Sequence, residues 1–219
     1  MDIPILFRDA RFVVLDKPAG LPAHPGPRGG ASVEDIFPSL SRRRDGPWLA
    51  HRLDADTAGC LVVALRRAAL HAAQAAFAAG AAEKTYWAVV EGGPDADAGT
   101  IDAPLLKVSD RAGWRMRVDA RGQPALTEWR VRGRGAGIAW LEVRPRTGRT
   151  HQVRAHCAAL GCPLLGDPVY GAGRGRLHLL ARAIRLPLAP PVVAEAPVPA
   201  HMRAALAACV SPAATTGGT

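Results

Sequence analysis

The sequence predicts an α+β fold with a largely antiparallel sheet, and two observations support this prediction. Short apolar or alternating stretches recur along most of the 219 residues, whereas only a few stretches have a helical period. Gly-rich or charged turns separate these stretches, which favours antiparallel neighbours over strands joined by crossover helices. An apolar fraction of 48% is enough to build a sizeable core. One domain over residues 1–210 is the simplest organisation, and we expect residues 211–219 to be disordered.

Three strands and one short helix are expected in the amino-terminal third. Ser32 can cap the helix, because Glu34 and Asp35 would then lie in its first turn. Gly59 precedes the third strand, where we expect it to let the backbone turn tightly. The expected strands are residues 3–6, 11–16 and 60–65, and the expected helix is residues 33–40.

Alternation and helical period define the elements of the remaining chain. Tyr86, Ala88 and Val90 fall on one face of a strand at residues 84–91. A helix over residues 67–79 can end at Gly80. The other expected strands are residues 99–104, 115–118, 125–132, 138–143 and 177–188, and the other helices run from Thr150 as cap to Gly161 and near residues 200–208.

The charge of the chain points to a polyanionic partner. The formal net charge is +9 and comes almost entirely from arginine, which suits bidentate contacts with phosphate. Nucleic acid is the partner that best fits this balance. We expect the arginines between residues 111 and 134 to make one side of the molecule basic. Residues 42–44 are either a solvated loop or a phosphate contact.

Cysteine usage and the amino terminus predict a cytoplasmic protein. The four cysteines form no C-x-x-C pair and are expected to be reduced thiols. The first residues lack a basic region followed by a long apolar run, and no stretch approaches eighteen apolar residues. We therefore expect neither a signal peptide nor a membrane span.

Two polar segments can carry chemistry. Residues 51–59, HRLDADTAG, place Asp54 just ahead of an apolar strand, at the rim of a rigid sheet. Asp54 or Asp56 could also simply cap a turn or pair with Arg52. At residues 146–160 a glycine turn leads into a helix, where backbone N–H groups and Arg149 can form an anion site.

Several classes of site lack support in the sequence. His151 and His156 are five residues apart, about 140° around a helix, so they do not form an i, i+4 metal pair. We expect no metal. The phosphate-binding G-x-x-x-x-G-K-[ST] loop, the G-x-G-x-x-G turn and the G-x-S-x-G elbow are not found in the sequence.

Four segments together resemble the RluA-type pseudouridine synthases. They are HRLDADTAG at 51–59, KTYWAVVEG at 84–92, GRTHQVRAH at 148–156 and GDPVYG at 166–171, and DKPAGLPAH at 16–24 is similar to the opening of the same fold. The resemblance implies a mixed, mostly antiparallel central sheet flanked by helices, with an active-site cleft at its middle. Ala58 and Leu180 depart from the family pattern, which usually has Ser and His there.

The resemblance also implies the reaction and its residues. Asp54 corresponds to the catalytic carboxylate, Arg154 to the arginine that pairs with it, and Tyr86 to the tyrosine that stacks on the target base. Arg52 corresponds to a residue that helps to displace a base from the RNA stack, which costs a few kcal/mol. Further RNA contacts are expected at His51, Thr57, Arg149, His151 and Gln152.

The implied reaction converts uridine in rRNA or tRNA to pseudouridine and needs no cofactor. We expect a monomer whose catalytic domain contacts RNA directly, since no segment resembles the S4-type RNA-binding domain of many relatives. The structural alternatives are that His151 satisfies a local backbone group, that Asp56 shapes a turn, and that Asp167 and Tyr170 shape a loop. Two other functions are a glycoside hydrolase that uses Asp54 with a second carboxylate and a non-catalytic RNA-binding protein.

Overall fold

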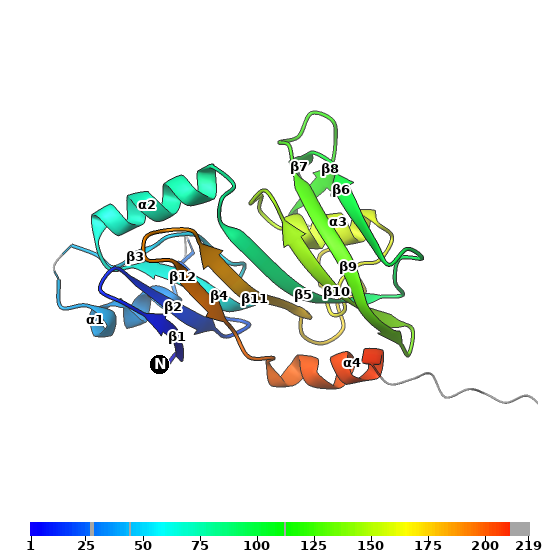
Figure 1. Ribbon diagram of the computed structural model, residues 1–219. Coiled ribbons are helices and arrows are strands. Elements are labelled where there is room, and N and C mark those ends of the chain that lie inside the picture. Colours follow the sequence, from blue (N-terminus) through cyan, green and yellow to red (C-terminus); the bar gives the residue numbers. More distant parts are fainter. Residues whose placement is uncertain (27–28, 44, 112, 211–219) are drawn as a thin grey trace, which may run out of the picture.

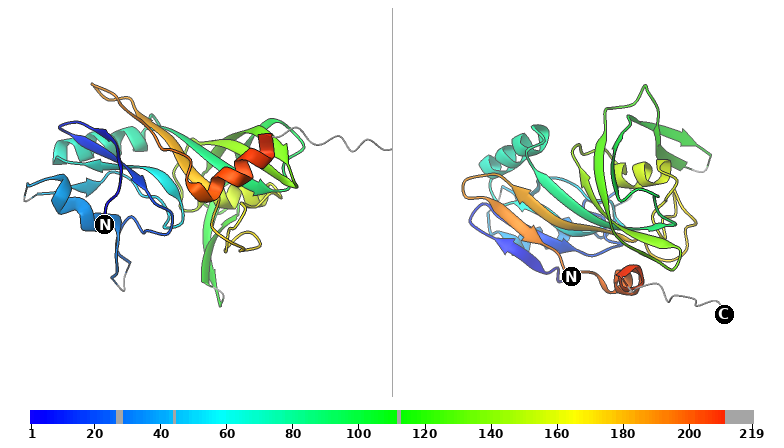
Figure 2. Two further views of the ribbon diagram at one scale, coloured as in Figure 1. Left: turned by 90° about the horizontal axis from the view of Figure 1, so that it is seen from below. Right: turned by 45° about the vertical axis from the view of Figure 1, so that its right-hand side comes forward.

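Ten strands form one mixed sheet in the computed structural model, which describes residues 1–26, 29–43, 45–111 and 113–210 (Figure 1). The strand order is β1-β2-β4-β11-β5-β10-β9-β6, with β12 beside β11 and β3 beside β4. Among the described strands, only β4 and β11 pair in parallel. The hairpin of β7 and β8 forms a sheet of its own and projects from the body of the molecule (Figure 2). The predicted α+β class is confirmed.

The elements follow the chain in this order: β1 (Ile5–Arg8), β2 (Phe12–Lys17), the 3-10 helix η1 (Val33–Ile36), α1 (Phe37–Leu40), β3 (Trp48–Leu49), β4 (Ala58–Ala64), α2 (Arg67–Ala78), β5 (Glu83–Glu91), β6 (Ala98–Asp102), β7 (Leu105–Asp110), β8 (Gly113–Val118), β9 (Leu126–Gly135), β10 (Ile138–Pro145), α3 (Gln152–Ala159), β11 (Leu179–Leu186), β12 (Val192–Glu195) and α4 (Ala200–Val210).

Each face of the sheet has its own core. Helices α2 and α4 cover one face, where α2 packs against β3 and β4 and α4 packs against β5, β9 and β10. On the other face η1 and α1 cover β2 and β4, while α3 covers β5 and β10. Tyr86 on β5 packs against both of these clusters, so it marks the middle of the sheet on the second face. All seven residues of β4 are buried, which explains its uniformly apolar sequence.

Most expected elements are present within a residue or two. Ser32 caps η1, accepting the Glu34 N–H, while the Asp35 side chain accepts the Ser32 N–H. Strands β7 and β12 were missed, because β7 is largely exposed and β12 lies in a Pro-rich stretch. The expected Thr150 cap of α3 is wrong: the cap is His151, in the left-handed conformation with φ of 50°. The expected disordered tail lies outside the described residues.

Gly59 has a different role from the one predicted. It lies inside β4 rather than before it, with φ of 106°. A Cβ atom there would come within 2.3 Å of the Ala181 carbonyl oxygen. Glycine is therefore required because β11 approaches β4 closely at this point.

Two further features concern the cysteines and the length of the helices. All four cysteines are buried free thiols. Within the described part of the chain, none of the helices has the length and apolarity that crossing a bilayer requires.

Candidate active site

The loop that carries Asp54 connects β3 to β4 and is fastened to β4 at both ends. His51 Nε2 accepts the Val62 N–H at 3.1 Å, and its ring packs 4.9 Å from the ring of Phe77. Burial lowers the pKa of His51 to about 4, so this acceptor is neutral at pH 7. The N–H of buried Thr57 donates to the Asp54 carbonyl at 3.1 Å and closes the turn. These contacts hold the loop; RNA contacts of His51 and Thr57 stay predictions.

Lys17 fastens the other side of the same loop. Its fully buried ammonium donates to the carbonyls of Pro18, Leu21 and Ala55 at 2.7–2.9 Å. Burial lowers the pKa of Lys17 to about 8, against the opposing effect of the nearby aspartates. The Ala55 carbonyl lies directly after Asp54, so Lys17 fixes the backbone beside that carboxylate.

Asp54 faces the start of α3. Its Oδ2 lies 3.5 Å from Arg154 Nη1 and 3.7 Å from His151 Nε2. The Asp54 side chain is 27% exposed, whereas that of Arg154 is only 4% exposed. The structure thus brings together two groups 100 residues apart in sequence, with the carboxylate on the solvent side.

Arg154 has a second and closer partner in Asp167. Its Nε and Nη2 donate to the two carboxylate oxygens at 2.8 and 2.7 Å, and both side chains are buried. The same carboxylate accepts the N–H groups of Val169 and Tyr170. Burial opposes ionisation of Asp167, but these hydrogen bonds outweigh it and hold its pKa below the ordinary value. Asp167 shapes the loop as expected, and its pairing with Arg154 was missed.

His151 connects these groups to Tyr170. Nε2 lies 3.1 Å from Arg154 Nη1, and Nδ1 lies 3.2 Å from the Tyr170 hydroxyl. A guanidinium can only donate, so Nε2 accepts and the proton sits on Nδ1. Burial lowers the pKa of His151, which keeps the ring neutral. The partners are side chains rather than the backbone group that we expected.

Tyr86 and Tyr170 supply the aromatic surroundings of the site. Burial raises the pKa of Tyr86, and the charge of Asp54 raises it further, so the phenol keeps its proton. The Tyr170 ring lies 5.4 Å from the Arg154 guanidinium, and its hydroxyl accepts the Met116 N–H at 2.8 Å. A carboxylate, a buried cation and a protonated phenol therefore meet at the middle of the sheet.

The model of the RNA pseudouridylate synthase family matches residues 11–159, a span that includes Asp54, Tyr86 and Arg154. The chain belongs to the RNA pseudouridylate synthase family. It is an RluA-type enzyme and thus an isomerase.

Relatives and a solved structure agree with this membership. The chain is 41% identical over 204 residues to an uncharacterized RNA pseudouridine synthase of Zymomonas mobilis, covering 89% of this chain and 93% of that protein. It is 37% identical over 194 residues to ribosomal large subunit pseudouridine synthase D of the same organism, covering 84% of this chain and 61% of that protein. The structure of human RNA pseudouridylate synthase domain containing 4 superposes with a TM-score of 0.80 at 27% identity, covering 94% and 92% of the two chains.

The two departures from the pseudouridine synthase pattern are neighbours in space. Ala58 on β4 and Leu180 on β11 are register partners, and both side chains lie in the core beneath α2. Their exposed fractions are 3% and 0%. An apolar pair at these positions leaves no buried polar group without a partner, so the two departures compensate each other.

The other residues expected to touch RNA differ in their freedom to do so. Arg52 is exposed beside the loop. Arg149 is half-buried, and its Nε donates to the Pro124 carbonyl at 2.9 Å. Gln152 is 4% exposed, and its amide bonds Thr147, Arg149 and β9, which leaves none of it for RNA. The side chain of Gln152 is therefore not the RNA contact that we expected. RNA contacts of Arg52 and Arg149 stay predictions.

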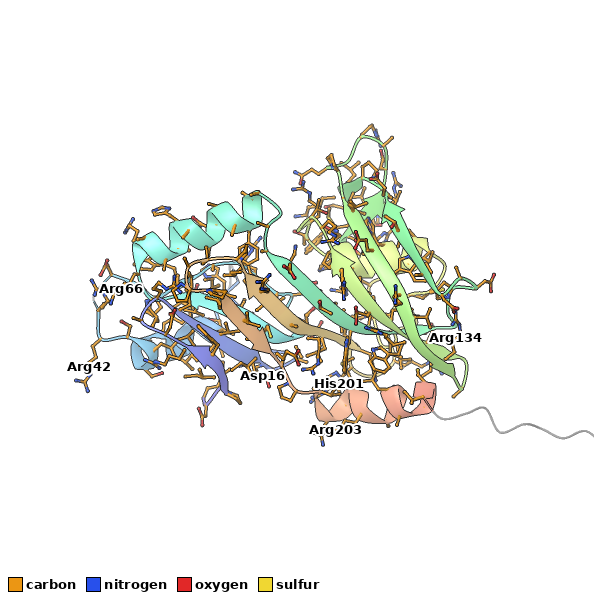
Figure 3. All side chains as sticks on the ribbon, in the orientation of Figure 1. Asp16, Arg42, Arg66, Arg134, His201 and Arg203 are labelled. Carbon is orange, nitrogen blue, oxygen red and sulfur yellow. The ribbon has the colours of Figure 1, made fainter. Side chains whose placement is uncertain are left out.

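The expected basic side of this pseudouridine synthase is interrupted by acidic partners. Arg132 bonds Glu142 at 2.6 Å and Arg134 bonds Asp97 at 2.7 Å. The labelled arginines lie at widely separated edges of the molecule (Figure 3). Neighbouring carboxylates thus partly neutralise the arginines of β9.

Proposed function

We propose that this chain isomerises specific uridines in rRNA or tRNA to pseudouridine, with Asp54 as the group that acts on the ribose. The observation that carries the proposal is the position of Asp54, a partly exposed carboxylate 3.5 Å from the buried guanidinium of Arg154. This arrangement presents a carboxylate beside a fixed positive charge where an RNA nucleotide can reach it. No cofactor and no metal are required, since the reaction is redox-neutral and intramolecular.

The chemistry assigns a task to each group. The bond between N1 of uracil and C1′ of ribose breaks, the base rotates, and C5 forms the new bond to C1′. C5 then loses its hydrogen as a proton, and N1 gains one. Asp54 serves as nucleophile at C1′ or stabilises the positive charge that develops there.

The neighbours of Asp54 handle the base. Tyr86 offers an aromatic face and a protonated phenol at the middle of the sheet, which suits stacking on an everted uracil. Exposed Arg52 can occupy the space that the everted base leaves in the RNA. Neutral His151, which accepts from Arg154 and lies 3.7 Å from the carboxylate, helps to hold Arg154 and Asp54 in place for substrate.

The kind of RNA and the setting are further parts of the proposal. A relative is named for the large ribosomal subunit, which makes rRNA the first substrate to test and tRNA the second. We expect the protein to act in the cytoplasm as a monomer. Four reduced thiols and a net charge of +9 are consistent with that setting.

The experiment compares Asp54→Asn with wild type on total RNA from cells that lack the gene, with tritium at C5 of uridine. Wild type should release tritium, and Asp54→Asn should lose activity by about a thousandfold or more. Asp56→Asn is the matched control, an exposed aspartate two residues away that should retain activity. Mapping the pseudouridines restored by wild type identifies the RNA and the position.

Three outcomes would overturn the proposal. Full tritium release by Asp54→Asn would mean that another group acts on the ribose. No release by wild type, with normal ribosome assembly in cells carrying Asp54→Asn, would favour the non-catalytic RNA-binding alternative. Release of sugar from a glycoside, with uridine left untouched, would favour the hydrolase.

A further inference from the structure

Trp114, near the start of β8, is an exposed aromatic side chain beside the active site. Its residue is 43% exposed, although indole is among the side chains that gain most from burial. The hairpin that carries it packs against α3, and the Met116 N–H also ties it to the loop after α3 by donating to the Tyr170 hydroxyl at 2.8 Å. The indole is therefore presented to solvent from a fixed position.

The indole lies one ring away from the catalytic carboxylate. It stacks on the His151 imidazole with centroids 4.7 Å apart and an interplanar angle of 29°. The Nε2 atom of His151 in turn lies 3.7 Å from Asp54 Oδ2. A nucleotide bound at Asp54 would thus have its chain neighbour within reach of Trp114.

A lysine side chain lies over the ring of the Trp114 indole. His151 occupies one face, which leaves the other to the Lys107 ammonium, 4.7 Å from the ring centroid. Lys107 is exposed, and a lysine side chain is long and flexible. A base can replace the ammonium on the ring while the ammonium moves to the phosphate of the same nucleotide.

We propose that Trp114 is a stacking platform for an unpaired base adjacent to the target uridine. This inference rests on the proposed function and names the substrate class, which is a uridine in a single-stranded loop with at least one unpaired neighbour. RNA rather than protein is the favoured occupant, because residues 105–121 carry five basic and two acidic side chains. Every base has a face that can stack, so the platform tolerates different neighbours.

The test uses a synthetic RNA hairpin that carries the uridine mapped with wild type, in the same tritium-release assay. Trp114→Ala should raise KM about ten- to hundredfold and leave kcat within about threefold, while Trp114→Phe loses less. Trp48→Phe is the matched control, since Trp48 also lies beneath a basic side chain, Arg67, and should leave KM unchanged. Thermal unfolding of each variant checks the fold.

A second arm removes the base on the RNA side. Deleting the base of the neighbouring nucleotide should raise the KM of wild type about as much as Trp114→Ala does. The same deletion should raise the KM of Trp114→Ala only a little further. Lys107→Met should weaken binding and lower the salt slope by about 0.7.

The outcomes separate the two proposals. If wild type converts the hairpin but Trp114→Ala keeps the wild-type KM, the stacking platform is wrong. It is also wrong if the increases in KM caused by Trp114→Ala and by deleting the neighbouring base multiply when the two changes are combined. A fall in kcat at constant KM would also overturn it, because Trp114 would then act by holding His151. Failure of wild type to convert any RNA would instead overturn the proposed function.

Discussion

Replacing Asp167 by asparagine tests which carboxylate holds Arg154. One oxygen of Asp167 accepts hydrogen bonds from Arg154 and from the N–H groups of Val169 and Tyr170, and the other accepts from Arg154 Nε. Asparagine keeps the shape and one acceptor. Its amide N–H₂ must face either Arg154 Nε or the other donors, so at least one donor–donor contact replaces a charge-assisted hydrogen bond.

The cost in stability follows from burial. Both partners are almost fully buried, and breaking a buried ion pair by removing one charge costs about 3–5 kcal/mol. Asp54 is still 3.5 Å from Arg154 and compensates part of the charge, so we expect a loss of about 3 kcal/mol at pH 7. The folded-state pKa of Asp167 is depressed, so its contribution exists above the ordinary carboxyl pKa and is lost as pH falls. The difference in free energy of unfolding between wild type and Asp167→Asn should therefore shrink as the pH falls below about 4.

Activity should fall for a separate reason. Freed from Asp167, the guanidinium of Arg154 can close on Asp54 and form a short charged hydrogen bond worth about 1.5–3 kcal/mol. That bond must weaken before the carboxylate acts on C1′, so kcat should drop about ten- to hundredfold.

Urea unfolding at pH 7 and well below pH 4 and tritium release measure the two effects of Asp167→Asn. Asp97→Asn is the matched control, because Asp97 also pairs with an arginine but is 88% exposed, and it should cost less than about 1 kcal/mol. Equal stabilities of Asp167→Asn and Asp97→Asn at pH 7, or a difference from wild type that stays unchanged well below pH 4, would refute the assignment of Asp167 as the main counter-ion.

Three more predictions concern the surroundings of the site. The pKa of His51 is about 4 in the folded state and about 6.5 in the unfolded state. The free energy of unfolding should therefore be highest above pH 6.5 and fall by about 3 kcal/mol toward pH 4. Urea unfolding should show this fall in wild type and not in His51→Gln. Lys17→Met leaves three buried carbonyls without their donor and should lower the free energy of unfolding by about 3 kcal/mol, whereas a change below about 0.5 kcal/mol would show that the ammonium is not needed. Ala58→Ser and Leu180→His should each destabilise by about 1–3 kcal/mol and the double variant by less than their sum; strict additivity in thermal unfolding would contradict contact between the two side chains.

Local sequence signals predicted most of the fold because they act within a few residues. The capping box at Ser32, the apolar run of β4 and the alternation of β5 each depend only on neighbours along the chain. β7 escaped prediction because it pairs with β8 outside the main sheet and has few buried residues. Its existence depends on the hairpin docking to α3.

The helix cap at His151 shows why tertiary contacts override a local rule. Threonine is a better helix N-cap than histidine by residue type. The N-cap of α3 is nevertheless His151, which adopts the left-handed conformation. A non-glycine residue in that conformation is costly unless its surroundings hold it. Arg154, Tyr170 and Trp114 all contact the imidazole, and two of these three are distant in sequence.

Asp167 was assigned only a loop role for a related reason. The motif around it describes a turn, and the carboxylate indeed accepts two N–H groups of that turn. Its main partner, Arg154, lies thirteen residues earlier on a helix, at a distance that no local pattern encodes. Pairing of buried charges is set by the packing of α3 against the loop, which the sequence alone does not reveal.

The unequal distances around Arg154 have a chemical consequence. In the mechanism that we propose, a guanidinium bound tightly to Asp54 would occupy the lone pairs needed at C1′ and would have to be displaced in every turnover. Asp167 instead takes the two short bonds, at 2.7 and 2.8 Å, and fixes the guanidinium while Asp54 lies at 3.5 Å. At that distance Asp54 still experiences the positive charge, because Coulomb attraction falls only gradually with distance in a partly buried site. The second carboxylate therefore holds Arg154 beside Asp54 while leaving the oxygens of Asp54 free to act.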